Sequence, residues 1–322
     1  MRKIQSVISV ALTLFTVGYA YAQAWPSKPV HFIVSQAAGS APDIICRLVS
    51  EPLARALGQP IVIENRPGAA NVLATAAAAK SSPDGYTFLF ATSAALTTNP
   101  YTVKNLPYDP VRDFVPVSMI ARGGFAIVVN SKIPARNLAE LVAYEKSQPG
   151  KLSMAVDGPR FLTGMLTTYM NNVMGTSFVQ VPYNSIVQGV QDTASGQTQV
   201  TIQPPLLVAP FIKRGELRAI AVTSATRDPS LPDVPTMGET FSGMQLAGWF
   251  MLLAPSGISP EIVQRVNREM DRILKEPAVQ QRLRDFAFYT DGAGTFASLN
   301  EFLRSELELW GKIVKTIGIQ PE

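Results

Sequence analysis

Short apolar runs of strand type alternate with longer runs of helical periodicity along most of this chain, and this alternation constrains the fold more than any other feature. Residues 30–34, 61–64 and 86–92 predict strands, and residues 42–57 and 70–80 predict helices. This order and spacing are typical of an α/β sheet with parallel neighbouring strands. Ligands of such sheets bind at loops beyond the carboxyl ends of the strands.

The same order of helices and strands begins again near residue 137 and continues to residue 224. The Pro-rich segment 227–240 predicts an irregular connection to another strand, and the C-terminal residues predict amphipathic helices that pack back on the first unit. We therefore expect two α/β lobes with a ligand cleft between them. The expected bounds are residues 23–122 with 229–322 for one lobe, 123–228 for the other, and crossings near 120–125 and 229–246.

Composition excludes several classes of protein. The chain has 322 residues, of which 47% are apolar and 16% charged, so two domains are expected. The net charge of +4 is spread without long basic runs, which argues against nucleic-acid binding. The single cysteine, Cys46, lies on an apolar helix pattern and is expected to be buried, and the single histidine, His31, falls in a predicted strand.

These counts also bear on catalysis. One histidine excludes a histidine cluster, and the sequence has neither metal-ligand spacing nor a G-x-S-x-G motif. An exported hydrolase with a serine–lysine mechanism remains as a remote alternative, although no serine–lysine pair has a suitable spacing. We expect a protein that is not an enzyme and that uses no cofactor or metal.

The first 22 residues predict a secretory signal peptide. Arg2 and Lys3 precede an apolar run over residues 7–17, and small residues follow at the spacing of a cleavage site after Ala22 or Ala24. No later apolar stretch approaches the ~20 residues that cross a bilayer. We expect an exported mature protein.

Six long motifs resemble those of one family over essentially the whole mature chain. The family is the solute-binding receptors of tripartite tricarboxylate transporters, also called the Bug family. The resemblance implies a type II periplasmic binding protein fold that closes on an organic acid in the periplasm, and delivery of that acid to membrane permease subunits by a monomer. The motifs cover residues 25–34, 64–70, 81–92, 105–121, 217–236 and 248–257.

In the first lobe, the loop after residue 34 has almost no bulky side chains before a helix. Small residues allow backbone N–H groups to approach a carboxylate, and the positive end of the following helix adds to the attraction. Asp43 either organises this turn or contacts the ligand, and the polar residues at the next strand end either bind or cap their own backbone. The candidate ligand-binding residues of this lobe are Ala38, Gly39, Ser40, Ala41, Asp43, Thr92 and Ser93, with Asn99 as a further donor.

In the second lobe, the sequence departs from the pattern that the resembled family shows. Arg160 and Phe161 stand in a loop where relatives carry small polar residues, and Gln203 stands where an Asp is frequent. Arg160 either binds a second carboxylate or pairs with Asp157, and Phe161 faces either the cleft or the core. The candidates of this lobe are Asp157, Gly158, Arg160, Phe161, Thr163, Asn184, Ser185, Ile186 and Gln203.

These departures favour an aromatic dicarboxylate such as terephthalate as the ligand of a transport receptor. A receptor for an aliphatic di- or tricarboxylate, and a co-receptor that signals to a sensor protein, remain as alternatives.

Overall fold

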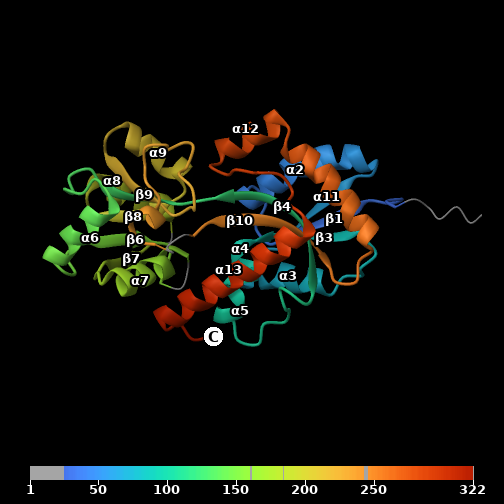
Figure 1. Cartoon of the computed structure of the whole chain (residues 1–322), viewed down its shortest axis with the longest axis horizontal. Coiled ribbons are helices and arrows are strands. Elements are labelled where there is room, and N and C mark those ends of the chain that lie inside the picture. Colours follow the sequence, from blue (N-terminus) through green and yellow to red (C-terminus); the bar gives the residue numbers. More distant parts are fainter. Residues whose placement is uncertain (1–24, 160–161, 184, 243–245, 322) are drawn as a thin grey trace, which may run out of the picture.

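The chain forms two α/β lobes that lie side by side along the longest axis of the molecule (Figure 1). The structure is a computed structural model, and it describes residues 25–159, 162–183, 185–242 and 246–321. The predicted signal peptide over residues 1–22 lies outside the described residues.

Lobe 1 is built on a five-stranded sheet with the order β2-β1-β3-β10-β4. Its first three strands run parallel, with Val34 opposite Phe90, and β10 runs antiparallel to both β3 and β4. The strands are β1 (Val30–Val34), β2 (Ile61–Asn65), β3 (Thr87–Thr92), β4 (Phe114–Gly123) and β10 (Gly248–Pro255).

Helices cover both faces of this sheet because its strands alternate apolar residues between the two faces. Phe32 packs with α2 and α11 on one face, whereas Ile33 packs with α3 and α4 on the other. Gly58, with a φ of 76°, ends α2 in the left-handed conformation that glycine adopts without strain. These helices are α2 (Ala41–Leu57), α3 (Val72–Ala79), α4 (Ser93–Thr97), α11 (Pro260–Leu274) and the neighbouring α12 (Pro277–Asp285).

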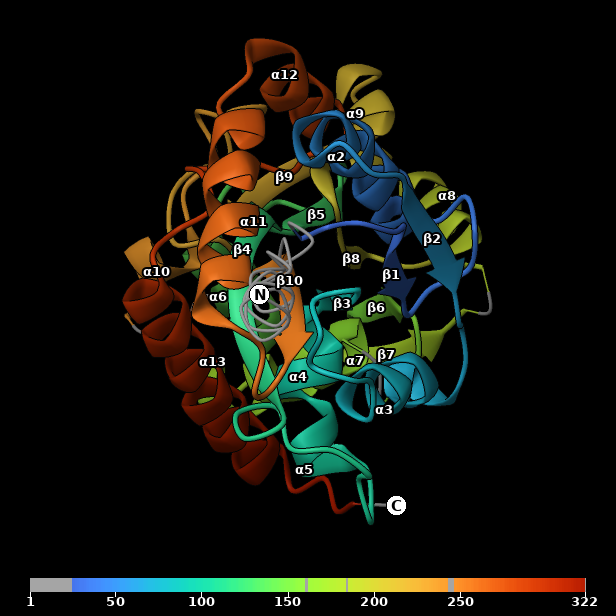
Figure 2. The ribbon, with the colours of Figure 1, turned by 90° about the vertical axis from the view of Figure 1, so that its right-hand side faces the viewer.

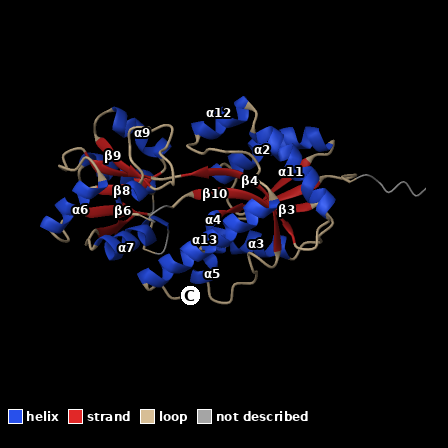
Figure 3. Cartoon of the chain, in the orientation of Figure 1, coloured by secondary structure: helices blue, strands red, loops and turns tan. Residues whose placement is uncertain are grey.

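Lobe 2 repeats this architecture with the sheet order β7-β6-β8-β5-β9. Helices α6 and α7 enclose the larger core cluster, and α8 and α9 cover the opposite face (Figure 3). The strands are β5 (Ala126–Asn130), β6 (Ser153–Val156), β7 (Val179–Pro182), β8 (Val200–Gln203) and β9 (Leu217–Val222). The helices are α6 (Leu138–Ser147), α7 (Leu162–Met174), α8 (Ile186–Ser195) and α9 (Pro205–Lys213).

Strand directions place the carboxyl ends of both sheets face to face. Strand β4 leaves lobe 1 toward lobe 2, and β3 and β1 run the same way because β10 is antiparallel to β4 and β3. Strand β5 leaves the crossing away from lobe 1, so its antiparallel partner β8, and β6 and β7 with it, run back toward lobe 1. The loops after β1, β3, β6, β7 and β8 therefore border the space between the lobes.

The two-lobed α/β fold with two chain crossings was predicted correctly, and so were most of its long elements, although β4 and β5 were not predicted as strands. Short helices were missed: α4, α5 (Asn99–Thr102), the 3-10 turn η1 (Ala69–Asn71), and α10 (Met237–Thr240) within the connection that was expected to be irregular. Their lengths explain this, because four or five residues carry too little periodicity to be recognised.

The last helix, α13 (Phe296–Ile317), departs from the expectation that the C-terminal helices pack on the first lobe alone. Its N-terminal half contributes Leu303 to the lobe 1 core, whereas Trp310 and Ile313 lie in the lobe 2 core cluster. A hydrogen bond from Asn172 Nδ2 to Thr316 O, 2.9 Å long, ties its end to α7. Helix α13 is thus a packing link between the lobes in addition to the two crossings.

We expect Trp310→Ala to lower the free energy of unfolding by about 3–5 kcal/mol, because the indole is 4% exposed and its loss leaves a cavity between α13 and lobe 2. Phe296→Ala is the control on the same helix, since Phe296 is 60% exposed and should cost less than about 0.5 kcal/mol. Urea denaturation measures both. Equal losses would show that α13 does not depend on its lobe 2 contacts.

Candidate functional site

The loop after β1 is held open by Asp43, which lies in the first turn of α2. The Asp43 carboxylate accepts a hydrogen bond from Gly39 N at 2.8 Å and from Asn65 Nδ2 at 3.0 Å, and it pairs with Arg47 at 3.0 Å. Gly39 has a φ of 81°, and a side chain built on it would meet no atom within 4 Å. The loop backbone at Ala38 and Gly39 is exposed as a result, and Asp43 acts as its anchor.

Hydrogen bonding sets the charge state of Asp43. Burial alone raises the pKa of this carboxyl, but hydrogen bonds from Arg47, Gly39 and Asn65 more than offset burial and hold the pKa below its usual value. Asp43 is therefore ionised across the neutral range, and its charge is used within the loop. The Ser40 hydroxyl is used locally as well, because it donates to Ala37 O at 2.7 Å.

Other polar residues of lobe 1 gather at the carboxyl ends of β1 and β3. Thr92 lies at the start of α4, with Ser93 half-buried after it, and the hydroxyls of Thr92 and Ser35 are buried with no hydrogen-bond partner among the described residues. Ser35 was not among the predicted site residues. Asn99 is bonded internally, to Ala70 O at 2.7 Å.

A second structural element at this edge was not predicted. Ala69, Ala70 and Asn71 all have positive φ values of 44°, 50° and 75°, which non-glycine residues rarely adopt. Asn71 is buried, and its Oδ1 accepts a hydrogen bond from Gln36 Nε2 at 2.6 Å, so this turn packs directly against the loop after β1. Only tertiary contacts could reveal this role, because the local sequence has no glycine at these three positions.

In lobe 2, Asp157 and Thr163 bind each other rather than facing outward. Thr163 N donates to Asp157 Oδ1 at 3.2 Å, the Thr163 hydroxyl donates to the same oxygen, and Asp157 N donates to the Thr163 hydroxyl at 2.9 Å. The pair closes the loop after β6 onto the start of α7. Gly158 within this loop has a φ of 135°.

The remaining candidates of lobe 2 differ in exposure. Ser185 and Ile186 begin α8, where Ser185 is exposed and Ile186 is half-buried. Gln203 ends β8 and is 3% exposed, so the side chain is largely enclosed by its own lobe. Arg160, Phe161 and Asn184 lie outside the described residues.

Five of the helices that begin at the facing edges share one property, whereas in α7 the Asp157 carboxylate accepts a hydrogen bond from the first-turn N–H of Thr163. In α2, α3, α4, α8 and α9, no side chain caps the first-turn N–H groups. By contrast, α6, α10, α11 and α13, which begin elsewhere, all have side-chain caps, whereas α5 and α12 lack them. Uncapped helix starts present free donors and partial positive charge. Five of them around the space between the lobes suit an anion.

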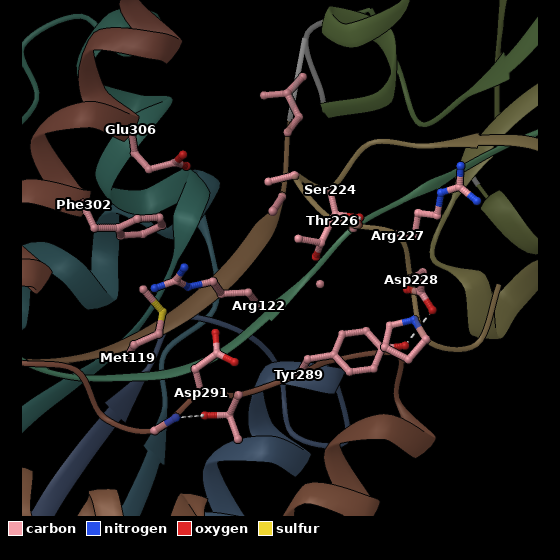
Figure 4. Close-up of a pocket in the computed structure, with 18 of the residues that line it drawn as sticks. Met119, Arg122, Ser224, Thr226, Arg227, Asp228, Tyr289, Asp291, Phe302 and Glu306 are labelled. Carbon is pink, nitrogen blue, oxygen red and sulfur yellow. Dashed lines mark hydrogen bonds between the residues drawn. The ribbon is translucent and has the colours of Figure 1, made fainter. Parts of the chain in front are cut away.

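One pocket of the described chain lies elsewhere, behind the crossings. It has a volume of about 660 Å³ and is lined by the end of β4, the segment after β9, and α13 (Figure 4). Both β4 and β9 are edge strands, so this pocket is separated from the carboxyl ends of β1 and β3 by the crossing strands. Figure 2 shows α13 on the opposite side of β10 from β1 and β2. None of the predicted site residues lines it.

Within the described residues, no group of three or more acidic, histidine or cysteine side chains is placed to hold a metal ion, and no helix is long and apolar enough to cross a membrane. Cys46 is buried, and burial raises the pKa of its thiol to about 12.

Two facing α/β sheets, joined by two crossings and bordered by donor-rich loops, define a two-lobed binding protein. The chain belongs to the tripartite tricarboxylate transporter family receptors, because the model of this family matches residues 45–319. It is 31% identical to protein BugT of Bordetella pertussis, over 99% of this chain and 98% of BugT. It is 33% identical to a relative from Bordetella bronchiseptica, over 98% of this chain and 93% of that protein.

Solved structures agree with this assignment. Rpa4515 of R. palustris, solved with adipate, is 31% identical, with a TM-score of 0.76 over 92% of this chain and 100% of its own. MatC of Rhodopseudomonas palustris, solved with bound malate, is 27% identical, with a TM-score of 0.71 over 90% of this chain and 100% of its own. The family of solute-binding receptors expected from the motifs is confirmed.

We expect Asp43→Asn to lower the free energy of unfolding at neutral pH by about 2 kcal/mol, the cost of weakening several charge-assisted hydrogen bonds. Because the folded pKa of Asp43 is lowered, this stabilisation is present above the unfolded pKa and is lost as pH falls through the folded value. The difference between wild type and variant should therefore shrink below about pH 4. Thermal unfolding across pH measures it.

Glu51→Gln is the matched control for this experiment, because Glu51 lies on the same helix with an 80% exposed side chain. A gap between wild type and Asp43→Asn that is as large in acid as at neutral pH would contradict a role for the charge.

We expect Gly164→Ala to destabilise lobe 2 by at least about 2 kcal/mol and to weaken ligand binding, because the added Cβ would lie 2.0 Å from Gly158 O and push the loop after β6 away from α7. Gly248→Ala is the control, since its Cβ would meet its nearest atom at 3.7 Å. Calorimetric unfolding measures the loss of stability, and titration with a dicarboxylate measures the loss of binding. A Gly164→Ala variant with unchanged stability and binding would contradict the close contact.

Proposed function

We propose that this protein is an exported receptor that captures a dicarboxylate between its lobes and delivers it to a tripartite transporter in the membrane. The observation that carries the proposal is the set of five uncapped helix starts bordering the space between the lobes. Backbone donors from both lobes suit carboxylates and require no cationic side chain in lobe 1. The carboxylates of Asp43 and Asp157 do not oppose this, because each is bonded within its own loop.

Two donor groups on opposite lobes favour a ligand with an acidic group at each end. The relatives solved with adipate and malate support a dicarboxylate. Terephthalate is our favoured ligand, because its benzene ring holds two carboxylates apart much as the carbon chain of adipate does. The sequence places Arg160 and Phe161 in the loop after β6, where a guanidinium would bind the second carboxylate and a phenyl ring would pack on the aromatic body.

Capture in this proposal is a closure of the lobes. A carboxylate that bridges the loops after β1 and β6 binds the closed arrangement more tightly than the open one, and so shifts the population toward closure. The closed receptor then docks on the permease, which releases the ligand. The signal peptide over residues 1–22 would bring the receptor to the periplasm.

Titration calorimetry of the mature protein with terephthalate, adipate, malate, citrate and benzoate tests the ligand class. We expect saturable binding of the dicarboxylates, with terephthalate the tightest. Arg160→Gln should weaken terephthalate at least about tenfold and benzoate far less, because benzoate has no second carboxylate to lose. Arg136→Gln is the control, since Arg136 is an exposed arginine of the same lobe away from the facing edges.

The outcomes separate the parts of the proposal. Binding of malate or citrate, with no binding of terephthalate, would contradict the aromatic ligand but not the receptor function. Binding of no carboxylate at all would overturn the receptor proposal. Loss of cellular dicarboxylate uptake on deletion of the gene would support delivery to a transporter, and unchanged uptake would favour a signalling role.

A further inference from the structure

The pocket behind the crossings holds charged groups that the proposed function does not use. Arg122, at the end of β4, has its guanidinium 4.6 Å above the ring of Phe302 on α13. Its backbone is fixed by two hydrogen bonds of 2.8 Å with Tyr289. Among the residues that the structure describes, none forms an ion pair or hydrogen bond with this guanidinium. An exposed guanidinium on an aromatic platform, with its donors free, is suited to a carboxylate.

Acidic groups lie in the same wall. Asp291 is exposed and makes no hydrogen bond or ion pair with another described residue. Glu306 accepts a hydrogen bond from Trp249 Nε1 at 2.8 Å through one oxygen, which leaves the other oxygen free. Figure 4 shows Arg122 between these two carboxyl groups. Burial raises the pKa of Glu306, while the Trp249 hydrogen bond and the charge of Arg122 act against burial, so Arg122 and Asp291 are the cation and the acid that this wall leaves for a ligand.

The opposite wall is bonded internally except for one buried carboxylate oxygen of Asp228, which has no hydrogen-bond partner among the described residues. Arg227 is held by Glu239 through two hydrogen bonds of 3.0 and 2.7 Å. Asp228 accepts a hydrogen bond of 2.6 Å from the Tyr289 hydroxyl, and burial with the nearby Asp228 raises the pKa of Tyr289 to about 12. This wall adds one buried acceptor oxygen to the pocket, and its cation is already paired, so the charge selection falls to Arg122 and Asp291.

We propose that this pocket is a second solute site, distinct from the space between the sheet edges, and that it takes a small zwitterion with one carboxylate and one ammonium group. The carboxylate pairs with the Arg122 guanidinium, and the ammonium group pairs with Asp291, while Glu306 lies on the other side of Arg122 and interacts with its charge. A simple carboxylate would pair with Arg122 but leave Asp291 without a partner. A simple amine would pair with Asp291 but leave the Arg122 guanidinium without a partner. The volume of about 660 Å³ falls within the range of small-molecule sites.

The test compares each amino acid with the carboxylate that lacks its amino group and with the amine that lacks its carboxylate. The amino acids are glycine, β-alanine and γ-aminobutyrate. The matching carboxylates are acetate, propionate and butyrate, and the matching amines are methylamine, ethylamine and propylamine. The reporter is the indole N–H resonance of Trp249, one of three tryptophans, because this group donates to Glu306. A Trp249→Phe variant assigns the resonance. We expect a saturable shift with at least one amino acid, and at least about tenfold weaker binding of the matching carboxylate and amine.

Variants locate the site. Arg122→Gln and Asp291→Asn should each weaken the amino acid at least about tenfold, with unchanged melting temperatures. Arg268→Gln, an exposed arginine of α11, should leave it unchanged. Equal binding of a carboxylate or an amine, retention of binding in Arg122→Gln, loss of binding in Arg268→Gln, or no saturable shift would each overturn the proposal. Dicarboxylate binding is measured separately, so the two proposals can fail independently.

Discussion

The pairing of β10 with β3 on one side and β4 on the other is the interaction on which the rest of the structure depends. Strand β4 carries the chain into lobe 2, and β10 brings it back between β4 and β3. The lobe 1 sheet is therefore incomplete until lobe 2 has been made and the chain has returned. The same antiparallel pairing sets the strand directions that turn both sets of carboxyl ends toward each other, and it makes β4 and β9 the edges that border the pocket behind the crossings.

Recognition in the proposed function rests on backbone rather than on side-chain charge. The facing loops keep their side chains small or use them to hold their own shape, as Asp43 does for Gly39 and as Asp157 does with Thr163. Helix starts without side-chain caps supply the positive potential. Such a site distinguishes acids from neutral solutes with little help from individual side chains, so the choice among acids falls to the few positions that carry large or charged groups.

Much of the fold could be predicted because its long elements have strong local signals. The β1 and α2 segments were located to within a residue or two, since apolar periodicity and Gly58 are local properties. The site was predicted less completely. The candidate residues of the loops stay predictions, and the hydrogen bonds between Asp157 and Thr163 were not foreseen. Ser35 and the Ala69–Asn71 turn were missed, because their roles come from neighbours that are distant in sequence.

The sequence by itself determined that this chain forms two α/β lobes, that small residues and helix starts follow the strands, and which family it belongs to, because periodicity and motifs are written in consecutive residues. Only the tertiary structure decided that α13 packs on both lobes, that five uncapped helix starts share one space, and that Arg122 lies between Asp291 and Glu306 in a pocket behind the crossings. These depend on strand order and on contacts between segments more than a hundred residues apart, which no local pattern encodes.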